Sequence, residues 1–506
     1  MSQAMVSVNG GLLLPVLAPA AGAAVILITD VVVQRLRRTH YVIALVSLLV
    51  GAAATVAGLG LGRVAGEARR TLCLPGGGQC MYVADSVTST LQLVALLAAA
   101  LTLLLSWPDD KLEPPGGTAV IVSLVLAATA GATAVAGARD LGTWLVALEL
   151  ATLPTVALVA LRGARSAISG AVALLTAALV SFGLLALSAG LWYTATGSGF
   201  LSPGAALAIV GDPTKRPILV LAVVVAIAGI GFKLSLVPFH AWTPEAYDGA
   251  PLPVAAFLAG VSKIAALAAL LVMIRAIAPL GAPPLAAIAI VSAVSMTLGN
   301  IMALRQNGVI RLLAWSTVAQ AGWVVLPLAA VSTSAVHASG TYLLAYVLAT
   351  LLAFAVIAAL VQIRGAARAR DLTQYRGLLG DHPILASALA LALLSLAGLP
   401  PGILGLVAKV AALRPVVDSQ LWLLAVIAAV NAVLGVAVYL RWLLMVISTP
   451  DPAAPAPPPA VPDGVTPVAA TVARVHPATL VAVGFTAVAL VVTSLSPQTL
   501  VGMLGI

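Results

Sequence analysis

The chain has 506 residues, of which 62% are hydrophobic and only 8% are charged. Soluble domains carry about 25% charged residues, so this composition cannot supply the polar surface that a water-exposed protein of this length needs. It excludes a soluble protein and indicates that lipid surrounds most of the chain. The net charge of +9 does not indicate nucleic-acid binding, because the basic residues lie mostly between apolar runs.

Long apolar runs divide the chain into segments of the length that crosses a membrane, about 20 residues each. They cover approximately residues 11–33, 41–62, 86–106, 119–137, 141–161, 167–193 and 217–239, and then 251–278, 284–303, 311–332, 338–363, 383–412, 420–447 and 478–503. The runs are continuous and rich in Ala and Leu, which disfavours a β-barrel. We therefore predict an all-α integral membrane protein with about 14 transmembrane helices.

The distribution of basic residues between the loops predicts an orientation. The odd-numbered loops hold fourteen Lys and Arg residues and the even-numbered loops hold eight, so we expect the odd loops in the cytoplasm and both termini on the outer face. The second loop opposes this trend with Arg63, Arg69 and Arg70. It also holds Cys73 and Cys80 around a Pro-Gly-Gly-Gly turn, where a disulfide is permitted on an outer face and two free thiols are the alternative.

Three of the five lysines, Lys233, Lys263 and Lys409, fall inside the apolar runs, and so does Glu149, one of four glutamates. Each charge costs about 2.5 to 3.5 kcal/mol on insertion scales, and buried charges in membranes commonly mark an ion pathway. The alternatives are lysines that extend to the headgroups or one static ion pair. A carboxylate that approaches or leaves a buried lysine changes how firmly the lysine holds its proton. Glu149 and Lys233 are the candidates for such a switchable pair.

Helix-breaking residues surround two of these lysines. In GIGFKLSLVPFHAW, glycines precede Lys233 and Pro238 follows it by five residues, while LAGLPPGILGLVAKVAALRP places two prolines and three glycines before Lys409. Interrupted helices at membrane depth are tolerated where they line a cavity. We predict that helices 7 and 12 are broken, and ordinary proline kinks are the alternative.

A near-constant offset relates residues in the two halves of the chain. The pairs are Trp144 with Trp315 and Glu149 with Gln320, both 171 residues apart, and Lys233 with Lys409 and Lys263 with Tyr439, both 176 residues apart. The offset predicts two homologous five-helix units, and an odd number of helices inverts the second unit in the membrane.

The predicted organisation has four parts. They are residues 1–115 with helices 1 to 3, residues 116–280 with helices 4 to 8 as the first repeat, residues 281–448 with helices 9 to 13 as the inverted repeat, and residues 449–506 with a Pro/Ala-rich loop and helix 14. Within the last part, Pro450 to Pro467 is predicted to be a semi-rigid cytoplasmic linker.

The sequence also limits the cofactors that this chain can hold. Two cysteines are too few to ligate an iron–sulfur cluster without other chains, and the five histidines lack metal-binding spacings. No nucleotide-binding glycine fingerprint occurs between a strand and a helix. We expect no metal or cofactor on this chain.

The stretch PFHAWTPEAYDGAPLPVAAFLAGVSKIAAL, from Pro238 to Leu267, resembles the helix 7 to 8 signature of the antiporter-like subunits of respiratory complex I, the proton-pumping NADH:quinone oxidoreductase. Supporting stretches are RLLAWSTVAQAGW from Arg311, LLSLAGLPPGILGLVAK from Leu393 and YLR from Tyr439. Together with the fourteen-helix pattern, the resemblance covers nearly the whole chain.

Three features distinguish the subunit types within that family. Lys263, with no histidine in the same helix, is similar to the N type, whereas the L and M types usually carry His there. Lys409 differs from the Glu that the M type has in helix 12, and the chain lacks the long C-terminal extension of the L type. Gln320 stands where many relatives have His, which puts a proton step at that position in doubt.

The resemblance implies a role for each buried charge. Glu149 is the helix 5 carboxylate, Lys233 the helix 7 lysine that it modulates, Lys263 the central relay of helix 8, and Lys409 the exit lysine. The implied route runs from the cytoplasm through Lys233 and Lys263, laterally to Lys409 and outward. His240, at the cytoplasmic end of helix 7, is either part of this polar axis or a structural interfacial histidine.

The resemblance also implies partners and a location. These are the other complex I subunits, especially the M-type subunit and the small membrane subunits beside it, in a bacterial inner (plasma) membrane. NAD, FMN, iron–sulfur clusters and quinone are expected in those partners, whose quinone reduction would drive proton translocation here. The alternatives are an ion-transport subunit of a multisubunit sodium/proton antiporter or membrane-bound hydrogenase, and a scaffold of the membrane arm with inert charges.

Overall fold

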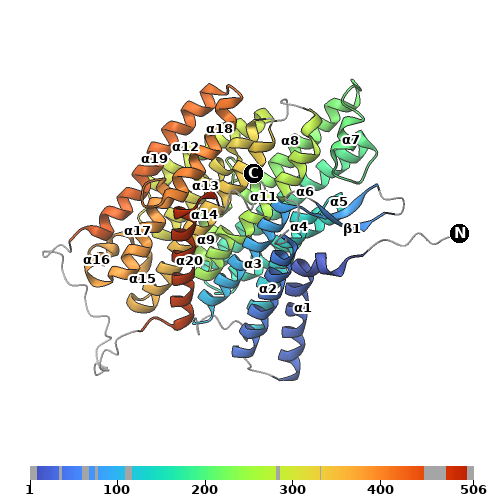
Figure 1. The fold of residues 1–506 in the computed structure, drawn as a ribbon. Coiled ribbons are helices and arrows are strands. Elements are labelled where there is room, and N and C mark those ends of the chain that lie inside the picture. The colour runs from blue at the N-terminus through green and yellow to red at the C-terminus, as the bar shows by residue number, and fades with distance from the viewer. Residues whose placement is uncertain are drawn as a thin grey trace.

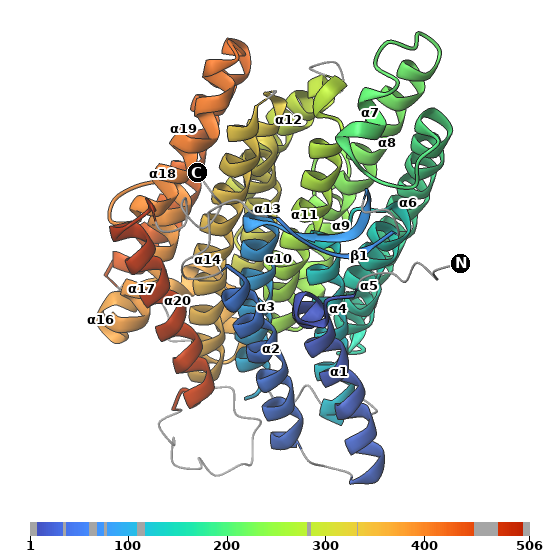
Figure 2. The ribbon, with the colours of Figure 1, turned by 45° about the vertical axis from the view of Figure 1, so that its right-hand side comes forward.

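The computed structural model describes residues 8–33, 37–59, 68–74, 78–108, 117–280, 285–330, 332–449 and 474–498. Within these ranges, 13 helices are long and apolar enough to cross a membrane. They run side by side in one bundle (Figure 1), and Figure 2 shows α6 and α8 on one side of it and α17 to α20 on the other. The predicted all-α membrane fold is confirmed, whereas the predicted linker from Pro450 to Pro467 lies outside the described residues.

The elements of the first half begin with two helices and a hairpin. They are α1 (Gly10–Val32), α2 (Arg37–Leu59), β1 (Arg69–Cys73), β2 (Cys80–Ala84), α3 (Ser86–Ser106), α4 (Gly117–Gly137), α5 (Leu141–Ala160), α6 (Arg165–Thr196), α7 (Pro203–Leu207), α8 (Lys215–Leu234), α9 (Trp242–Gly249), α10 (Leu252–Ala259), α11 (Val261–Ala276) and η2 (Ala278–Leu280).

The second half is helical throughout the residues that the structure describes. Its elements are α12 (Leu285–Leu304), α13 (Val309–Val325), η3 (Leu326–Ala329), α14 (Thr333–Arg364), α15 (Ala366–Arg370), η4 (Leu372–Tyr375), α16 (Leu378–Asp381), α17 (Pro383–Ala397), α18 (Ile403–Asp418), α19 (Trp422–Ile447) and α20 (Pro477–Leu495).

Two spans are interrupted where the sequence predicts breaks. The seventh span ends as α8 at Leu234, turns through Ser235 in the left-handed conformation (φ 68°), and resumes as α9. The twelfth ends as α17 at Ala397, turns through Gly398 (φ 78°), and resumes as α18. Each half of the twelfth span is shorter than a full membrane crossing, so 13 candidate spans are found among the described residues against the predicted 14. The breaks leave backbone carbonyls without helical partners at membrane depth, where they are free to bind side chains.

A third interruption was not predicted. The eighth span, expected as one run over 251–278, divides into α10 and α11 at Gly260 (φ −104°, ψ −85°). The Gly260 carbonyl accepts hydrogen bonds from the amides of both Lys263 and Ile264. An isolated glycine in an apolar run is compatible with an unbroken helix, so the sequence offers only a weak signal here. The break lies one turn before Lys263.

The second loop forms a β-hairpin, which the all-helical prediction missed. Strands β1 and β2 pair antiparallel with Cys73 opposite Cys80, and a disulfide joins these two residues. Of the two states that the sequence leaves open, the structure has the disulfide. The Asn9 amide donates to Thr71 Oγ1 at 2.8 Å, so the hairpin is bound to the start of α1. Hydrogen bonds between the two strands stabilise the hairpin, and the periodicity of the sequence did not predict these strands.

An ionic cluster next to the hairpin joins the start of α3 to Arg139, after α4, and to Arg275 on α11. Asp85 caps α3 by accepting from the Thr88 amide at 2.8 Å, and its Oδ2 lies 2.7 Å from Arg275 and 3.6 Å from Arg139. Burial raises the pKa of the Asp85 carboxyl, but Arg275, Arg139 and Thr88 lower it by more, so the pKa lies below its usual value. The carboxylate therefore stabilises the fold in its ionised form.

Replacing Asp85 with Asn should lower the stability of the protein by about 1–3 kcal/mol at neutral pH, because two arginines lose their counter-charge. The contribution is present above the ordinary pKa of a carboxyl and is lost as the pH falls through the lowered pKa of the folded state. Thermal unfolding of the purified protein in detergent should therefore separate wild type from Asp85→Asn at pH 7 and not in strong acid. Asp418→Asn, in an exposed pair with Arg414, is the control and should change little.

Alkylation mass spectrometry should find Cys73 and Cys80 unmodified in untreated membranes and doubly modified after reduction. After reduction, a membrane-impermeant maleimide should label them in right-side-out vesicles and not in inverted ones, since the hairpin is predicted to face outward. Labelling restricted to inverted vesicles would reverse the predicted orientation of every span.

Candidate functional site

Glu149 and Lys233 form the ion pair that the sequence singles out. The Lys233 ammonium on α8 donates to Glu149 Oε1 on α5 at 2.9 Å and to Thr152 Oγ1 at 2.8 Å. Lys233 is only 7% exposed, so it does not extend to the headgroups. Thr152 follows Glu149 by three residues on α5, which places both side chains on one helical face. This lysine therefore has a carboxylate and a hydroxyl as alternative proton partners.

Lys263 lies in the first turn of α11 and binds the break of the seventh span. Its Nζ donates to the Lys233 carbonyl at 3.0 Å and to Ser235 Oγ at 2.5 Å, and it lies 4.8 Å from the centre of the Trp242 ring. The Thr243 hydroxyl donates to the same Ser235 oxygen at 2.5 Å. The broken turn at the end of α8 thus makes two contacts. Its backbone carbonyl at Lys233 binds Lys263, and the Lys233 side chain binds Glu149.

Lys409 has a simpler environment on α18. Its Nζ donates to the Ala397 carbonyl, at the end of α17, at 2.5 Å and lies 5.7 Å from the centre of the Trp323 ring. It is 7% exposed and forms no ion pair with the residues that the structure describes. Both Lys263 and Lys409 are therefore bound by a carbonyl at a helix break and by an aromatic face, which attracts a cation.

A buried cluster of hydroxyl groups surrounds Gln320, on α13. The Gln320 amide donates from Nε2 to the Tyr439 oxygen at 2.8 Å, and the Tyr342 hydroxyl donates to Gln320 Oε1 at 2.5 Å. Tyr439 also bonds Ser316 at 2.6 Å. The position equivalent to Glu149 under the predicted repeat is thus occupied by a neutral side chain with two phenol partners.

Sequence reasoning named Gln320 and Tyr439 but missed the tyrosines of α14. Tyr342 and Tyr346 are four residues apart in TYLLAYVLAT and so share one helical face. Tyr346 bonds Thr317 at 2.9 Å. Two phenols at helical spacing in an otherwise apolar run were an available signal for a polar pathway.

His240 lies between α8 and α9. Its ring centre is 5.2 Å from that of Trp315, and its Nδ1 is buried without a hydrogen-bond partner among the described residues. No hydrogen bond or ion pair joins it to a buried lysine within the described part of the chain. The predicted contribution of His240 stays a prediction.

A second ionic cluster joins the two halves at α9. Arg311, at the start of α13, lies 3.5 Å from Glu245 and 3.7 Å from Asp248, and Arg370 lies 3.7 Å from Asp248. These acidic residues follow the break in the seventh span. The short helix beyond the break is therefore fixed to the second half of the chain by charge.

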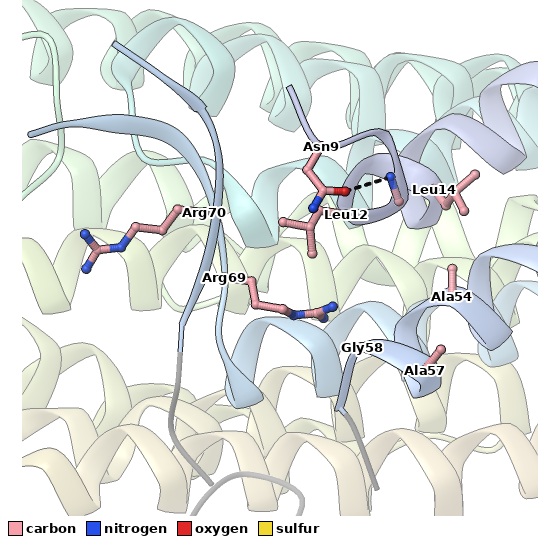
Figure 3. A pocket seen from close by; sticks show the side chains of 9 residues that line it. Asn9, Leu12, Leu14, Ala54, Ala57, Gly58, Arg69 and Arg70 are labelled. Carbon is pink, nitrogen blue, oxygen red and sulfur yellow. Dashed lines mark hydrogen bonds between the residues drawn. The ribbon is translucent and has the colours of Figure 1, made fainter. Parts of the chain in front are cut away.

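Small cavities adjoin the broken spans. One of about 20 Å³ is lined by Lys233, Thr152, Thr155, Trp242 and Ser262 among others. A larger cavity, of about 540 Å³, lies between α1, α2 and β1 beside Arg69 and Arg70, and contains none of the buried lysines (Figure 3). Among the described residues, no group of three or more His, Cys, Asp or Glu side chains could hold a metal ion.

Residues 138–435 match the family model described as NADH:quinone oxidoreductase/Mrp antiporter, TM. The chain is 39% identical over 459 residues to NADH-quinone oxidoreductase subunit N from Salinispora tropica, covering 88% of this chain and 87% of the relative. It matches a chain of respiratory complex I from Thermus thermophilus with bound aureothin at 31% identity and a TM-score of 0.74, covering 97% and 99% of the two chains. A chain of the Mrp complex from Dietzia sp. matches with a TM-score of 0.81 at 22% identity, covering 98% and 96% of the two chains, which shows the shared fold.

The fold and the matched region define the class: an antiporter-like membrane subunit built from broken helices with buried lysines. This chain belongs to the NADH:quinone oxidoreductase and Mrp antiporter family of membrane subunits, and within it to the subunit N group of NADH-quinone oxidoreductase. The resemblance drawn from Lys263 and the helix 7 to 8 stretch is confirmed.

Replacing Glu149 with Ala should destabilise the protein by about 3–5 kcal/mol, because Lys233 would remain buried without its carboxylate. The double variant Glu149→Ala with Lys233→Met should recover much of that loss, since it removes the uncompensated charge. Thermal unfolding in detergent measures both effects. A double variant that loses as much stability as Glu149→Ala alone would contradict a mutual dependence.

Proposed function

We propose that this chain carries protons across the membrane along a buried Glu/Lys relay, as a subunit of an NADH:quinone oxidoreductase, driven by quinone reduction in partner subunits. The observation that carries the proposal is the chain Glu149, Lys233 and Lys263, in which each member contacts the next through a side chain or a backbone carbonyl. The membership of the subunit N group supports it.

The break in the seventh span couples the first two lysines. The Lys233 side chain donates to Glu149, and the Lys233 carbonyl accepts from Lys263. A movement of the backbone at this broken turn therefore changes both contacts at once. When Glu149 withdraws, the positive charge on Lys233 loses its compensation and the lysine more readily gives up a proton. Neutral Lys263 is the acceptor one step further into the bundle.

Lys409 is proposed as the exit group. It has no carboxylate among the described residues, so its charged form depends on the Ala397 carbonyl and the Trp323 ring. A cation held by neutral groups alone is released more easily than one held by a carboxylate. The proton therefore stays on Lys233 while Glu149 is paired with it, and movement toward Lys409 becomes favourable only once Glu149 has withdrawn.

The proposed setting is a bacterial inner (plasma) membrane with both termini on the outer face and the other complex I subunits around the chain. The M-type subunit and the small membrane subunits are its proposed neighbours. NAD, FMN, iron–sulfur clusters and quinone would be held by partners. The proposal also includes the predicted division of the chain into four parts with the second repeat inverted. The parts are residues 1–115, 116–280, 281–448 and 449–506.

The sodium/proton antiporter alternative has a specific observation in its favour, the likeness to a chain of the Mrp complex, but at 22% identity that likeness shows the fold alone. Proton uptake that continues unchanged in sodium-free vesicles would support the proton pathway. Uptake that requires sodium would support the alternative.

The single variants Lys233→Ala, Lys263→Ala, Lys409→Ala and Glu149→Ala should each lower NADH-driven proton uptake by inverted vesicles about ten-fold or more, as expected when a proton-transfer group is lost. The control is Lys215→Ala, an exposed lysine at the start of the same helix as Lys233. His240→Ala tests the remaining candidate.

The amount of assembled complex in the membrane must be measured for each variant. Assembled complexes that pump at the wild-type rate with all four changes made singly would support a scaffold with inert charges instead. Loss restricted to the four buried positions, with Lys215→Ala unaffected, would support the relay.

A further inference from the structure

A small cavity lies between the buried hydroxyl cluster and the helix that carries Lys409. Its space for the centre of a water molecule is about 10 Å³, which is enough for one water. Its lining comprises Gln320, Tyr342 and Tyr346 on one side and Ser395 and Ala408 on the other, with Ala345, Leu396 and Gly405 completing it. The cavity thus bridges α13 and α14 to the broken twelfth span.

One polar side chain in this cavity has no partner. Ser395 is 3% exposed, and its hydroxyl oxygen is buried without a hydrogen-bond partner among the described residues. Leaving a buried hydroxyl unpaired costs about 1–3 kcal/mol, so such groups commonly bind ordered water. Ser395 precedes by two residues the Ala397 carbonyl that binds Lys409, and Ala408 is the neighbour of Lys409 in sequence.

The two phenols that line the cavity are not equivalent. The Tyr342 hydrogen is donated to Gln320 Oε1 at 2.5 Å, and an amide carbonyl oxygen accepts that bond without a hydrogen of its own to pass on. Tyr342 therefore offers the cavity only an acceptor. A proton cannot advance through Gln320 by exchange of hydrogen bonds, as it could through a histidine.

Tyr346 can both receive and donate a proton. It bonds Thr317 at 2.9 Å, and the Thr317 hydroxyl has a second acceptor, the Leu313 carbonyl, also at 2.9 Å. When the Thr317 hydrogen turns from Leu313 to Tyr346, the Tyr346 hydrogen is free to point into the cavity. A hydroxyl with two acceptors in reach makes this turn by rotation alone.

We propose that the cavity is a water site formed by Ser395, Tyr342 and Tyr346, and that its water is the last proton carrier before Lys409. The proposal rests on the proposed function. A proton arriving from the Lys263 side of the relay enters the Thr317 hydroxyl as Thr317 gives its own proton to Tyr346. Tyr346 then gives one to the water, and the water gives one to the neutral amine of Lys409, which leaves the Ala397 carbonyl to receive it. Water and both hydroxyls end as neutral molecules, and Gln320 holds Tyr342 as the acceptor that orients the water.

The test compares variants in the assembled complex in inverted vesicles. Ser395→Ala and Tyr346→Phe should lower NADH-driven proton uptake about ten-fold or more, whereas Ser395→Thr, which keeps the hydroxyl, should retain most of it. Matched controls are Tyr375→Phe and Ser339→Ala, buried hydroxyls bonded to carbonyls outside the cavity, at Ala369 and Val324. Both controls should pump at close to the wild-type rate.

Wild-type uptake in assembled Ser395→Ala and Tyr346→Phe complexes would overturn the proposal. If these variants lose assembly, a high-resolution map of the wild-type complex decides: a solvent peak within hydrogen-bond distance of Ser395 Oγ supports the water site, and a dry cavity overturns it. Lys409→Ala separates this proposal from the relay itself. Loss of uptake in Lys409→Ala with normal uptake in Ser395→Ala would reject only the water site, while normal uptake in both would reject the relay as well.

Discussion

The structure depends on how three lysine side chains are held in an apolar membrane interior. Helix breaks solve this problem for two of them, because a broken turn leaves carbonyls free to bind an ammonium group. Lys263 binds the carbonyl at one break and Lys409 the carbonyl at another. The same breaks fix where the side chain of Lys233 meets Glu149. The helix breaks, which would otherwise weaken the helices, therefore provide the carbonyl groups that bind the buried lysines.

The two halves of the bundle use related geometry with different electrostatics. Glu149 provides a negative charge beside Lys233, whereas Gln320 provides a neutral amide between two phenols in the second half. A carboxylate stabilises a buried ammonium far more than neutral dipoles do. The first half is therefore suited to holding a charge and the second to releasing one. The ionic cluster at α9 joins the two halves outside the apolar core.

Much of the site was accessible from the sequence. Charges in apolar runs, with glycine and proline beside them, identified Glu149, Lys233, Lys263 and Lys409, and the breaks beside two of these lysines. The break at Gly260 and the β-hairpin were missed, because one glycine or one short polar loop carries little periodic signal. The tyrosines of α14 were missed because phenols are compatible with an ordinary apolar core.

Composition and the order of residues determined the membrane class, the approximate spans and the family, since these follow from local hydrophobicity and from short motifs. Only the tertiary structure decided which groups meet. Lys263 contacts a carbonyl 30 residues away, and Gln320 bonds a phenol 119 residues away. Such contacts are set by how helices pack and rotate against one another, and no local pattern encodes them. The sequence thus identified the buried charges, and only the tertiary structure showed which groups they contact.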